Sequence, residues 1–358
     1  MNQQEYRNLI SGKKTGITAA SQRLLLSAAS LCYAIPVAVR NFFYKRGILK
    51  THKVGAVVIS IGNITTGGTG KTPLVIWLCD FLQKKNIEPS VLTRGYKTGR
   101  KGIDIDEPAV ILQNCPTTQV VVNPDRVAGA ALAIEKFGSH VLIIDDGFQH
   151  RRLARDIDIV TIDAAEPFGF NKLLPAGLLR EPVKSIARAD AVVITRSDQV
   201  QAERLAEIEK KILEIKADLA IARVIHKPVS IHTPGGREIS IDEIKGKKIF
   251  AFCGIGNPGG FFDTIKNCGA EIKGSEIFDD HHHYTEEEIR QISRKAIECG
   301  AEFTLTTEKD WTKITNLNID KKGNFAFIRI RIDFTDGLEK LTHLINKTLA
   351  GKISKRQE

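Results

Sequence analysis

The sequence has few of the features that mark secreted, metal-bound or membrane-embedded proteins. Its six cysteines lie far apart and form no CxxC pair, which argues against both a zinc site and a disulfide framework. No apolar run is long enough to span a bilayer comfortably, because spanning takes about 20 residues. Internal repeats are also lacking. These absences favour a globular protein in a reducing cytoplasm.

Aromatic residues make up only 6% of the chain, and acidic residues are scarce in its first part. Residues 1–53 contain nine bases and one acid (Glu5), so they carry +8 of the net charge of +10. The rest of the chain is therefore nearly neutral. A nucleic-acid-binding protein would carry basic residues with interleaved aromatics on its folded body, so we expect no nucleic-acid partner.

The basic N-terminal part also contains an apolar stretch from Leu24 to Val39, which Ser27, Ser30 and Pro36 interrupt. An apolar helix flanked by Lys and Arg suits the headgroup region of an anionic leaflet. We therefore predict that residues 1–53 form a membrane-associating segment with an amphipathic helix. The alternative is a helix packed on the core of the protein.

From Val54 onward, short apolar runs alternate with helical patterns, which is typical of an α/β fold with a mostly parallel sheet. With 358 residues the chain exceeds one usual core, so we expect a larger α/β domain over 54–226 and a smaller α/β domain over 227–358. The predicted strands are 56–61, 90–92, 119–122, 141–144, 157–162, 191–195, 220–225, 249–253, 271–278 and 302–306. The predicted helices follow Thr72 and cover 125–137, 201–216, 259–267 and 285–299.

The most specific motif is Gly62–Pro73, which lies between a predicted strand and a predicted helix. Its glycines let backbone N–H groups and the helix N-terminus face phosphate oxygens, while a lysine reaches the outer phosphates and a hydroxyl binds Mg²⁺. It predicts a P-loop NTPase-like fold with ATP and Mg²⁺ as cofactors. The expected ATP-binding residues are Thr65, Thr66, Gly67, Gly68, Thr69, Gly70, Lys71 and Thr72.

A second motif, Val141–His150, places Asp145 and Asp146 directly after an apolar strand. Ligands of open α/β sheets bind at the carboxyl ends of the strands, so carboxylates beside a P-loop are expected to organise Mg²⁺. We predict a metal site formed by Thr72, Asp145 and Asp146.

Together these motifs and several others resemble the lipid A 4′-kinases (tetraacyldisaccharide 4′-kinases) of Gram-negative bacteria, from about Leu24 to Arg331. This many ordered blocks in one chain is specific. They are Gly62–Pro73, Thr93–Tyr96, Asp106–Pro108, Asp125–Arg126, Asp145–Arg152, Gly169–Gly177, Arg180–Pro182, Gly254–Pro258, Asp280–His281 and Thr306–Asp310.

The resemblance implies transfer of the γ-phosphoryl of ATP to the 4′-hydroxyl of a tetraacylated glucosamine disaccharide 1-phosphate. It also implies a peripheral or monotopic location on the cytoplasmic face of the inner membrane, and no obligate protein partner is inferred. Carried onto this chain, Asp106 is the general base, with His281 as its partner and Lys71 as the phosphate-binding lysine. Glu107 joins the predicted metal ligands. Arg94, Arg126, Asn171 and Arg180 are the predicted substrate-binding residues, although any single arginine could instead form a structural ion pair.

Three other interpretations compete. Gly254-x-Gly256-x-x-Gly259 has the form of a dinucleotide-binding turn, but no hydride-transfer residues accompany it. The run His281–His283 lacks the spacing of a closed zinc site. A membrane-associated P-loop switch ATPase is the more serious rival. That class usually has a lysine just before the Gly pair, where this chain has Thr66.

Overall fold

The computed structural model describes residues 3–97, 103–104, 106–315, 317 and 324–353. These residues form two compact units, and each is described by itself. Unit 1 comprises residues 1–103, 111–225 and 332–358, and unit 2 comprises residues 104–110 and 226–331. Strands β9 (Ala220–His232) and β14 (Phe325–Asp336) contribute residues to both units.

Unit 1 is built on a parallel sheet with the strand order β9-β8-β7-β1-β6-β2-β5. Every residue of the central strand β1 (Val57–Asn63) is buried, because helices cover both faces of the sheet. The carboxyl ends of β1 and β6 meet, since Ile61 pairs with Asp145. The other strands of this sheet are β2 (Pro89–Thr93), β5 (Gln119–Val122), β6 (Val141–Asp145), β7 (Ile157–Asp163) and β8 (Ala191–Thr195), while β3 (Tyr96–Lys97) and β4 (Ile103–Asp104) form a separate pair.

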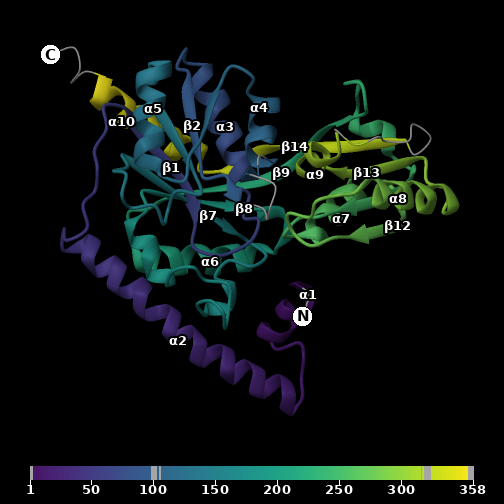
Figure 1. The fold of residues 1–358 in the computed structure, drawn as a ribbon, viewed down its shortest axis with the longest axis horizontal. Coiled ribbons are helices and arrows are strands. Elements are labelled where there is room, and N and C mark those ends of the chain that lie inside the picture. The colour runs from purple at the N-terminus through teal and green to yellow at the C-terminus, as the bar shows by residue number, and fades with distance from the viewer. Residues whose placement is uncertain (1–2, 98–102, 105, 316, 318–323, 354–358) are drawn as a thin grey trace. The chain divides into compact units, whose positions relative to one another are not determined.

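Helices of unit 1 lie along this sheet (Figure 1). Leu205, Ile208 and Ile212 of α6 (Ala202–Ile215) pack on β7 and β8. Asp125 caps α5 by accepting a hydrogen bond of 3.0 Å from the backbone N–H of Val127, and Gly138 ends that helix in the left-handed region at φ 64°. The remaining helices are α3 (Lys71–Gln83), α4 (Asp106–Asn114, which begins in unit 2), α5 (Arg126–Phe137) and α10 (Leu338–Ile353).

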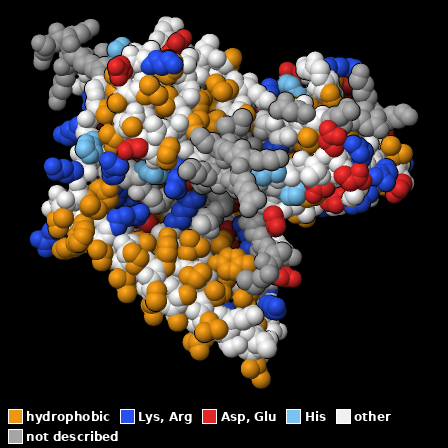
Figure 2. Space-filling model, viewed as in Figure 1, with side chains coloured by type: hydrophobic (Ala, Val, Ile, Leu, Met, Phe, Trp, Pro, Cys, Tyr) orange, Lys and Arg blue, Asp and Glu red, His pale blue; other side chains and the backbone are white. Residues whose placement is uncertain are grey.

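The N-terminal segment forms α1 (Gln3–Ile10) and one long helix, α2 (Ile17–Lys45). The prediction that no apolar run is long enough to span a bilayer was wrong. Helix α2 continues through Pro36 for 29 residues. By length and composition alone, it is long and apolar enough to cross a membrane. Only Ala19 and Val37 of α2 are buried. Figure 2 shows hydrophobic side chains gathered over α2.

The strands of unit 2 have the order β12-β11-β13-β14-β9, and β10 pairs antiparallel with β9. Successive residues of β11 face opposite sides: Ala251 packs with α7, whereas Phe250 and Phe252 pack with α8 and α9. Thr285 and Glu288 form a capping box at the start of α8. The elements of unit 2 are β10 (Glu238–Ile239), β11 (Lys248–Cys253), α7 (Pro258–Asn267), β12 (Glu271–Ile277), α8 (Glu286–Glu298), β13 (Phe303–Thr307) and α9 (Glu308–Ile314). The predicted α/β fold with a P-loop and an N-terminal amphipathic helix is confirmed.

Candidate functional site

The loop between β1 and α3 has the backbone geometry of a phosphate cradle. Gly67 and Gly70 adopt φ values of 102° and 79°, which side chains rarely tolerate. Gly70 is the N-cap of α3, so Lys71 and Thr72 open that helix where its unpaired N–H groups point outward. An anion placed there would also meet the positive end of the helix dipole.

Buried hydroxyl groups hold this loop from behind. The side-chain amide of Asn63 donates to the Thr69 hydroxyl at 3.0 Å, and that hydroxyl lies 2.7 Å from the hydroxyl of Thr161. The Thr195 hydroxyl donates to the backbone oxygen of Thr69 at 3.1 Å. The hydroxyl of Thr69 therefore helps to hold the loop in place. Thr65 is also buried and forms a backbone bridge with Leu179.

Arg196 supports the loop from the side, and sequence reasoning did not find it. Its Nη2 donates to the backbone oxygen of Gly68 at 2.9 Å, while its Nη1 pairs with Asp163. Asp163 ends β7 and Arg196 directly follows β8, so both lie at the sheet edge that carries the P-loop. That shared position at the ends of neighbouring parallel strands is the signal that could have identified the pair.

The segment from residue 169 to residue 180 is attached to the P-loop. The N–H of Thr66 donates to the oxygen of Leu178, and the N–H of Arg180 donates to the oxygen of Ile64, both at 2.7 Å. A Cβ at Gly177 would lie 2.3 Å from the Lys172 oxygen, so only glycine fits this fold-back. These contacts bring Arg180 to the site.

Lys71, Asp146 and Arg180 form the charged centre of the site. Nη1 of Arg180 lies 2.9 Å and 2.8 Å from the two carboxylate oxygens of Asp146, and Nζ of Lys71 lies 3.5 Å from one of them. Burial acts to raise the pKa of Asp146, but the charges of Lys71 and Arg180 outweigh it and hold that pKa well below its usual range. Asp146 is therefore ionised at neutral pH.

The turn that carries these carboxylates packs tightly against β1. Asp146 has a left-handed φ of 52°, and a Cβ at Gly147 would lie 2.5 Å from the Ser60 hydroxyl. Likewise, a Cβ at Gly62 would lie 2.5 Å from the backbone nitrogen of Phe148. Glycines at these two positions thus let the end of β1 and the Asp145–Gly147 turn touch.

Arg126 lies beneath the same turn. It is only 3% exposed, and its guanidinium donates to the backbone oxygens of Asn123 at 2.7 Å and Asp145 at 3.3 Å. Nearby, burial and the charges of Arg126 and Arg94 lower the pKa of His150 to about 4, so that this histidine is neutral at pH 7. Arg94 is exposed.

Asn171 does not join this cluster of charged residues. Its side-chain oxygen accepts a hydrogen bond of 2.7 Å from Lys211, and the pair is exposed. Its φ of 57° is left-handed, which asparagine tolerates better than most residues.

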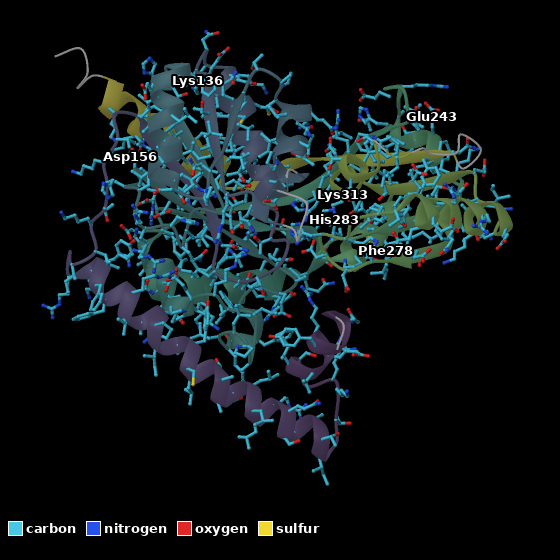
Figure 3. All side chains as sticks on the ribbon, in the orientation of Figure 1. Lys136, Asp156, Glu243, Phe278, His283 and Lys313 are labelled. Carbon is cyan, nitrogen blue, oxygen red and sulfur yellow. The ribbon has the colours of Figure 1, made fainter. Side chains whose placement is uncertain are left out.

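Unit 2 carries a second group of predicted site residues. Nζ of Lys309 lies 3.2 Å from a carboxylate oxygen of Asp280 and 3.3 Å from Nε2 of His281. Asp106 and Glu107 open α4 in the same unit, but the side chain of Asp106 lies outside the described part of the chain. Phe278, His283 and Lys313, labelled in Figure 3, are also part of unit 2.

The donor atoms at the P-loop fit Mg²⁺. The ion prefers oxygen ligands, and it is usually held by one or two protein groups together with substrate phosphates. A hydroxyl from Thr72 and carboxylates from Asp145 and Asp146 provide that chemistry at the sheet edge. Within the described ranges, no cluster of three or more His, Cys, Asp or Glu that could hold a metal ion is found.

Comparison with known proteins assigns the chain to a family. The family model for tetraacyldisaccharide-1-P 4′-kinase, LpxK, matches residues 22–350. The tetraacyldisaccharide 4′-kinase of Syntrophus aciditrophicus is 40% identical over 342 residues, covering 89% of this chain and 91% of the relative. That of Chlorobaculum parvum is 33% identical over 365 residues, covering 94% and 98%.

A solved structure agrees with these relatives. LpxK of Aquifex aeolicus, crystallised in complex with ATP, is 32% identical and superimposes with a TM-score of 0.71, covering 92% of this chain and 99% of that one. The chain therefore belongs to the tetraacyldisaccharide-1-phosphate 4′-kinase family.

Proposed function

We propose that the chain is an ATP-dependent kinase of lipid A biosynthesis. It phosphorylates the 4′-hydroxyl of a tetraacylated glucosamine disaccharide 1-phosphate and produces the 1,4′-bisphosphate. The observation that carries this proposal is the cluster of Lys71, Asp146 and Arg180 at the start of α3, in a chain that belongs to this kinase family. A switch ATPase is disfavoured because Thr66 stands where that class carries its lysine.

Different residues at the P-loop bind different parts of the nucleotide and its metal ion. The triphosphate lies along the glycine-rich loop at the N-terminus of α3, where Lys71 exchanges its contact with Asp146 for the outer phosphates. Thr72, with Asp145 and Asp146, holds Mg²⁺, which neutralises phosphate charge when bound. Arg180 contacts phosphate oxygens. Arg126 positions the Asp145 turn from below.

The acceptor is activated by the second group of residues. Asp106 accepts the proton of the 4′-hydroxyl as that oxygen attacks the γ-phosphorus and the bond to the ADP oxygen breaks. His281 positions this carboxylate, and Glu107 is a further metal ligand. Arg94 is exposed and can contact the acceptor phosphate. The side-chain amide of Asn171 can contact the acceptor once its hydrogen bond with Lys211 is broken.

We propose that the apolar face of α2 brings the enzyme to the membrane that holds its acceptor. Leu24, Leu25, Leu31 and Ile35 are 64–72% exposed and follow the basic residues of the N-terminus. We propose that this face enters the headgroup region on the cytoplasmic side of the inner membrane, as a peripheral or monotopic anchor. The acyl chains of the acceptor then stay in the bilayer while the sugar reaches the site.

Release of ADP in the presence and absence of the acceptor tests this function. The kinase proposal predicts slow hydrolysis alone, strong stimulation by tetraacyldisaccharide 1-phosphate in mixed micelles, and loss of both rates in Lys71→Met. Hydrolysis that the acceptor leaves unchanged would instead support a switch ATPase.

A further inference from the structure

The segment Thr306–Asp310 is held rigidly in unit 2. Thr307 caps α9 by accepting from the N–H of Asp310 at 3.1 Å, and Glu308 pairs with Arg329 at 2.8 Å. The carboxylate of Asp310 is fully buried, accepts from the N–H of Gly254 at 2.9 Å and pairs with Lys313 at 3.2 Å. The contacts of its neighbours therefore fix the position of Lys309.

The close contact at Gly254 explains the glycine there. A Cβ at this position would lie 3.1 Å from the Asp279 oxygen and 3.2 Å from a carboxylate oxygen of Asp310. The block Gly254–Pro258 thus serves to bring the Asp279–His281 loop and the start of α9 together.

His281 lies in a strained part of this loop. Its φ of 62° is left-handed, which side chains rarely adopt, and such strain is concentrated at functional sites. The carboxylate of Asp280 accepts from the N–H of His281 at 3.1 Å and helps to hold this conformation. The strained backbone directs the imidazole toward Lys309.

The contact between Lys309 and His281 has a chemical consequence. A lysine ammonium carries three donors and no acceptor, so Nε2 of His281, at 3.3 Å, must accept the hydrogen bond. A neutral imidazole that accepts at Nε2 carries its proton on Nδ1.

The charge of Lys309 is maintained by its neighbours. Burial acts to lower its pKa, but the carboxylates of Asp280, Glu107 and Asp310 outweigh that effect and raise the pKa above its usual value. The side chain is 22% exposed, so the ammonium is only partly hydrated. Lys309 therefore remains a donor throughout the working pH range.

We propose that Lys309 is a positioning residue that fixes His281 as the Nδ1-protonated neutral imidazole. This inference rests on the proposed kinase function. In this state His281 has no lone pair left to act as a base, but its Nδ1–H can donate to a carboxylate. Asp106 then takes the acceptor proton itself, and His281 orients it.

The ring nitrogens of His281 give the most direct test, because their protonation is measured without turnover. In ¹⁵N–¹H spectra of the full chain in micelles, with His281 assigned through His281→Gln, we expect the Nδ1–H tautomer. Lys309→Met should shift the ring toward Nε2–H, while the ring of His282, which contacts Glu288 at 3.1 Å, stays unchanged. A His281 ring unaffected by Lys309→Met would overturn the proposal.

Kinetics separate positioning from mere structural support. We expect Lys309→Met to lower kcat about 10–100-fold with little change in KM for ATP, and Lys309→Arg, which keeps a donor, to recover part of the loss. Lys295→Met, which removes an exposed lysine that pairs with Glu276, is the matched control and should leave kcat unchanged. Equal rates in Lys309→Met and Lys295→Met would contradict the proposal, whereas an inactive wild type would contradict the kinase function alone.

Discussion

Arg180 meets Asp146 with one guanidinium nitrogen placed within 2.9 Å of both carboxylate oxygens, and Lys71 approaches the same carboxylate at 3.5 Å. The carboxylate of Asp146 is thus paired with Lys71 and Arg180, the two cations that we expect to bind the phosphates of ATP. Nucleotide binding must separate these ion pairs. Asp146 therefore has two opposing effects, since it competes with phosphate but also helps to bind Mg²⁺.

This opposition predicts an unusual result for Asp146→Asn. Without Mg²⁺, the variant should bind ATP about 10-fold more tightly than the wild type, because a negative charge beside the phosphates has been removed. With Mg²⁺, the gain should vanish and turnover should fall. Titration calorimetry with and without a chelator measures both.

The control for Asp146→Asn is Asp158→Asn. Asp158 is also buried and pairs with an arginine, Arg155, at 2.7 Å, but it lies near the opposite end of β7 from the site. Its replacement should leave the affinity for ATP unchanged. Weaker Mg²⁺-free binding in Asp146→Asn would contradict the competition that we describe.

One buried carboxylate, that of Glu181, joins α2 to the rest of unit 1. Glu181 is fully buried and accepts hydrogen bonds from Arg40 at 3.1 Å and Asn41 at 2.9 Å, both of α2, and pairs with Arg188 at 3.0 Å. Glu181→Ala leaves these arginines unpaired, so we expect the free energy of unfolding to fall by about 3–5 kcal/mol at pH 7.

This loss should depend on pH in one direction. Burial acts to raise the pKa of Glu181, but Arg188, Asn41 and Arg40 outweigh it, so the folded pKa lies below the unfolded one. The stabilisation is then complete above the unfolded pKa of about 4.3 and disappears as pH falls through the folded pKa. Denaturant unfolding at pH values from 7 downward should show that the difference in the free energy of unfolding between the wild type and Glu181→Ala becomes smaller. Glu207→Ala, at an exposed pair with Arg204, should change little at any pH.

The exposed face of α2 predicts a membrane-binding phenotype. Changing Leu24, Leu25 and Leu31 together to Gln should reduce binding to anionic vesicles about 10³–10⁶-fold, because each leucine contributes roughly 1.5–3 kcal/mol when removed from water. The fold should survive, since these side chains are 69–72% exposed. Vesicle co-sedimentation measures the change.

Exposed leucines elsewhere in unit 1 supply the comparison for α2. Leu112, Leu132 and Leu213 are 40–44% exposed on other helices, and their combined change to Gln should leave vesicle binding intact. If both triple variants bound equally well, the assignment of α2 to the membrane would be wrong.

Much of the fold follows from local pattern. The predicted strands 119–122 and 191–195 match β5 and β8 residue for residue. Every residue of β8 is buried, and a strand covered on both faces reads as a continuous apolar run. The predicted start and end of α5 are also confirmed, since Asp125 caps its beginning and Gly138 its end. Such signals lie within a few residues of each other and need no tertiary contact.

Other parts depend on partners distant in sequence. No element is predicted beyond Thr306, yet β14 and α10 follow. Only Phe325–Ile328 of β14 are buried, and an exposed, charged half follows them, so the strand does not read as one continuous apolar run. The pairing of Arg180 with Asp146 joins residues 34 positions apart through a fold-back that no local pattern specifies. The same holds for Lys309, whose position is set by contacts with separate loops.

The central claim is phosphoryl transfer to the 4′-hydroxyl, and the most direct measurement follows labelled γ-phosphate from Mg·ATP into tetraacyldisaccharide 1-phosphate in mixed micelles. We expect a labelled 1,4′-bisphosphate with the wild type. Lys71→Ala and Asp106→Ala should each lower its formation about 10²–10⁴-fold. Labelled inorganic phosphate without labelled lipid, or full transfer by Asp106→Ala, would contradict it.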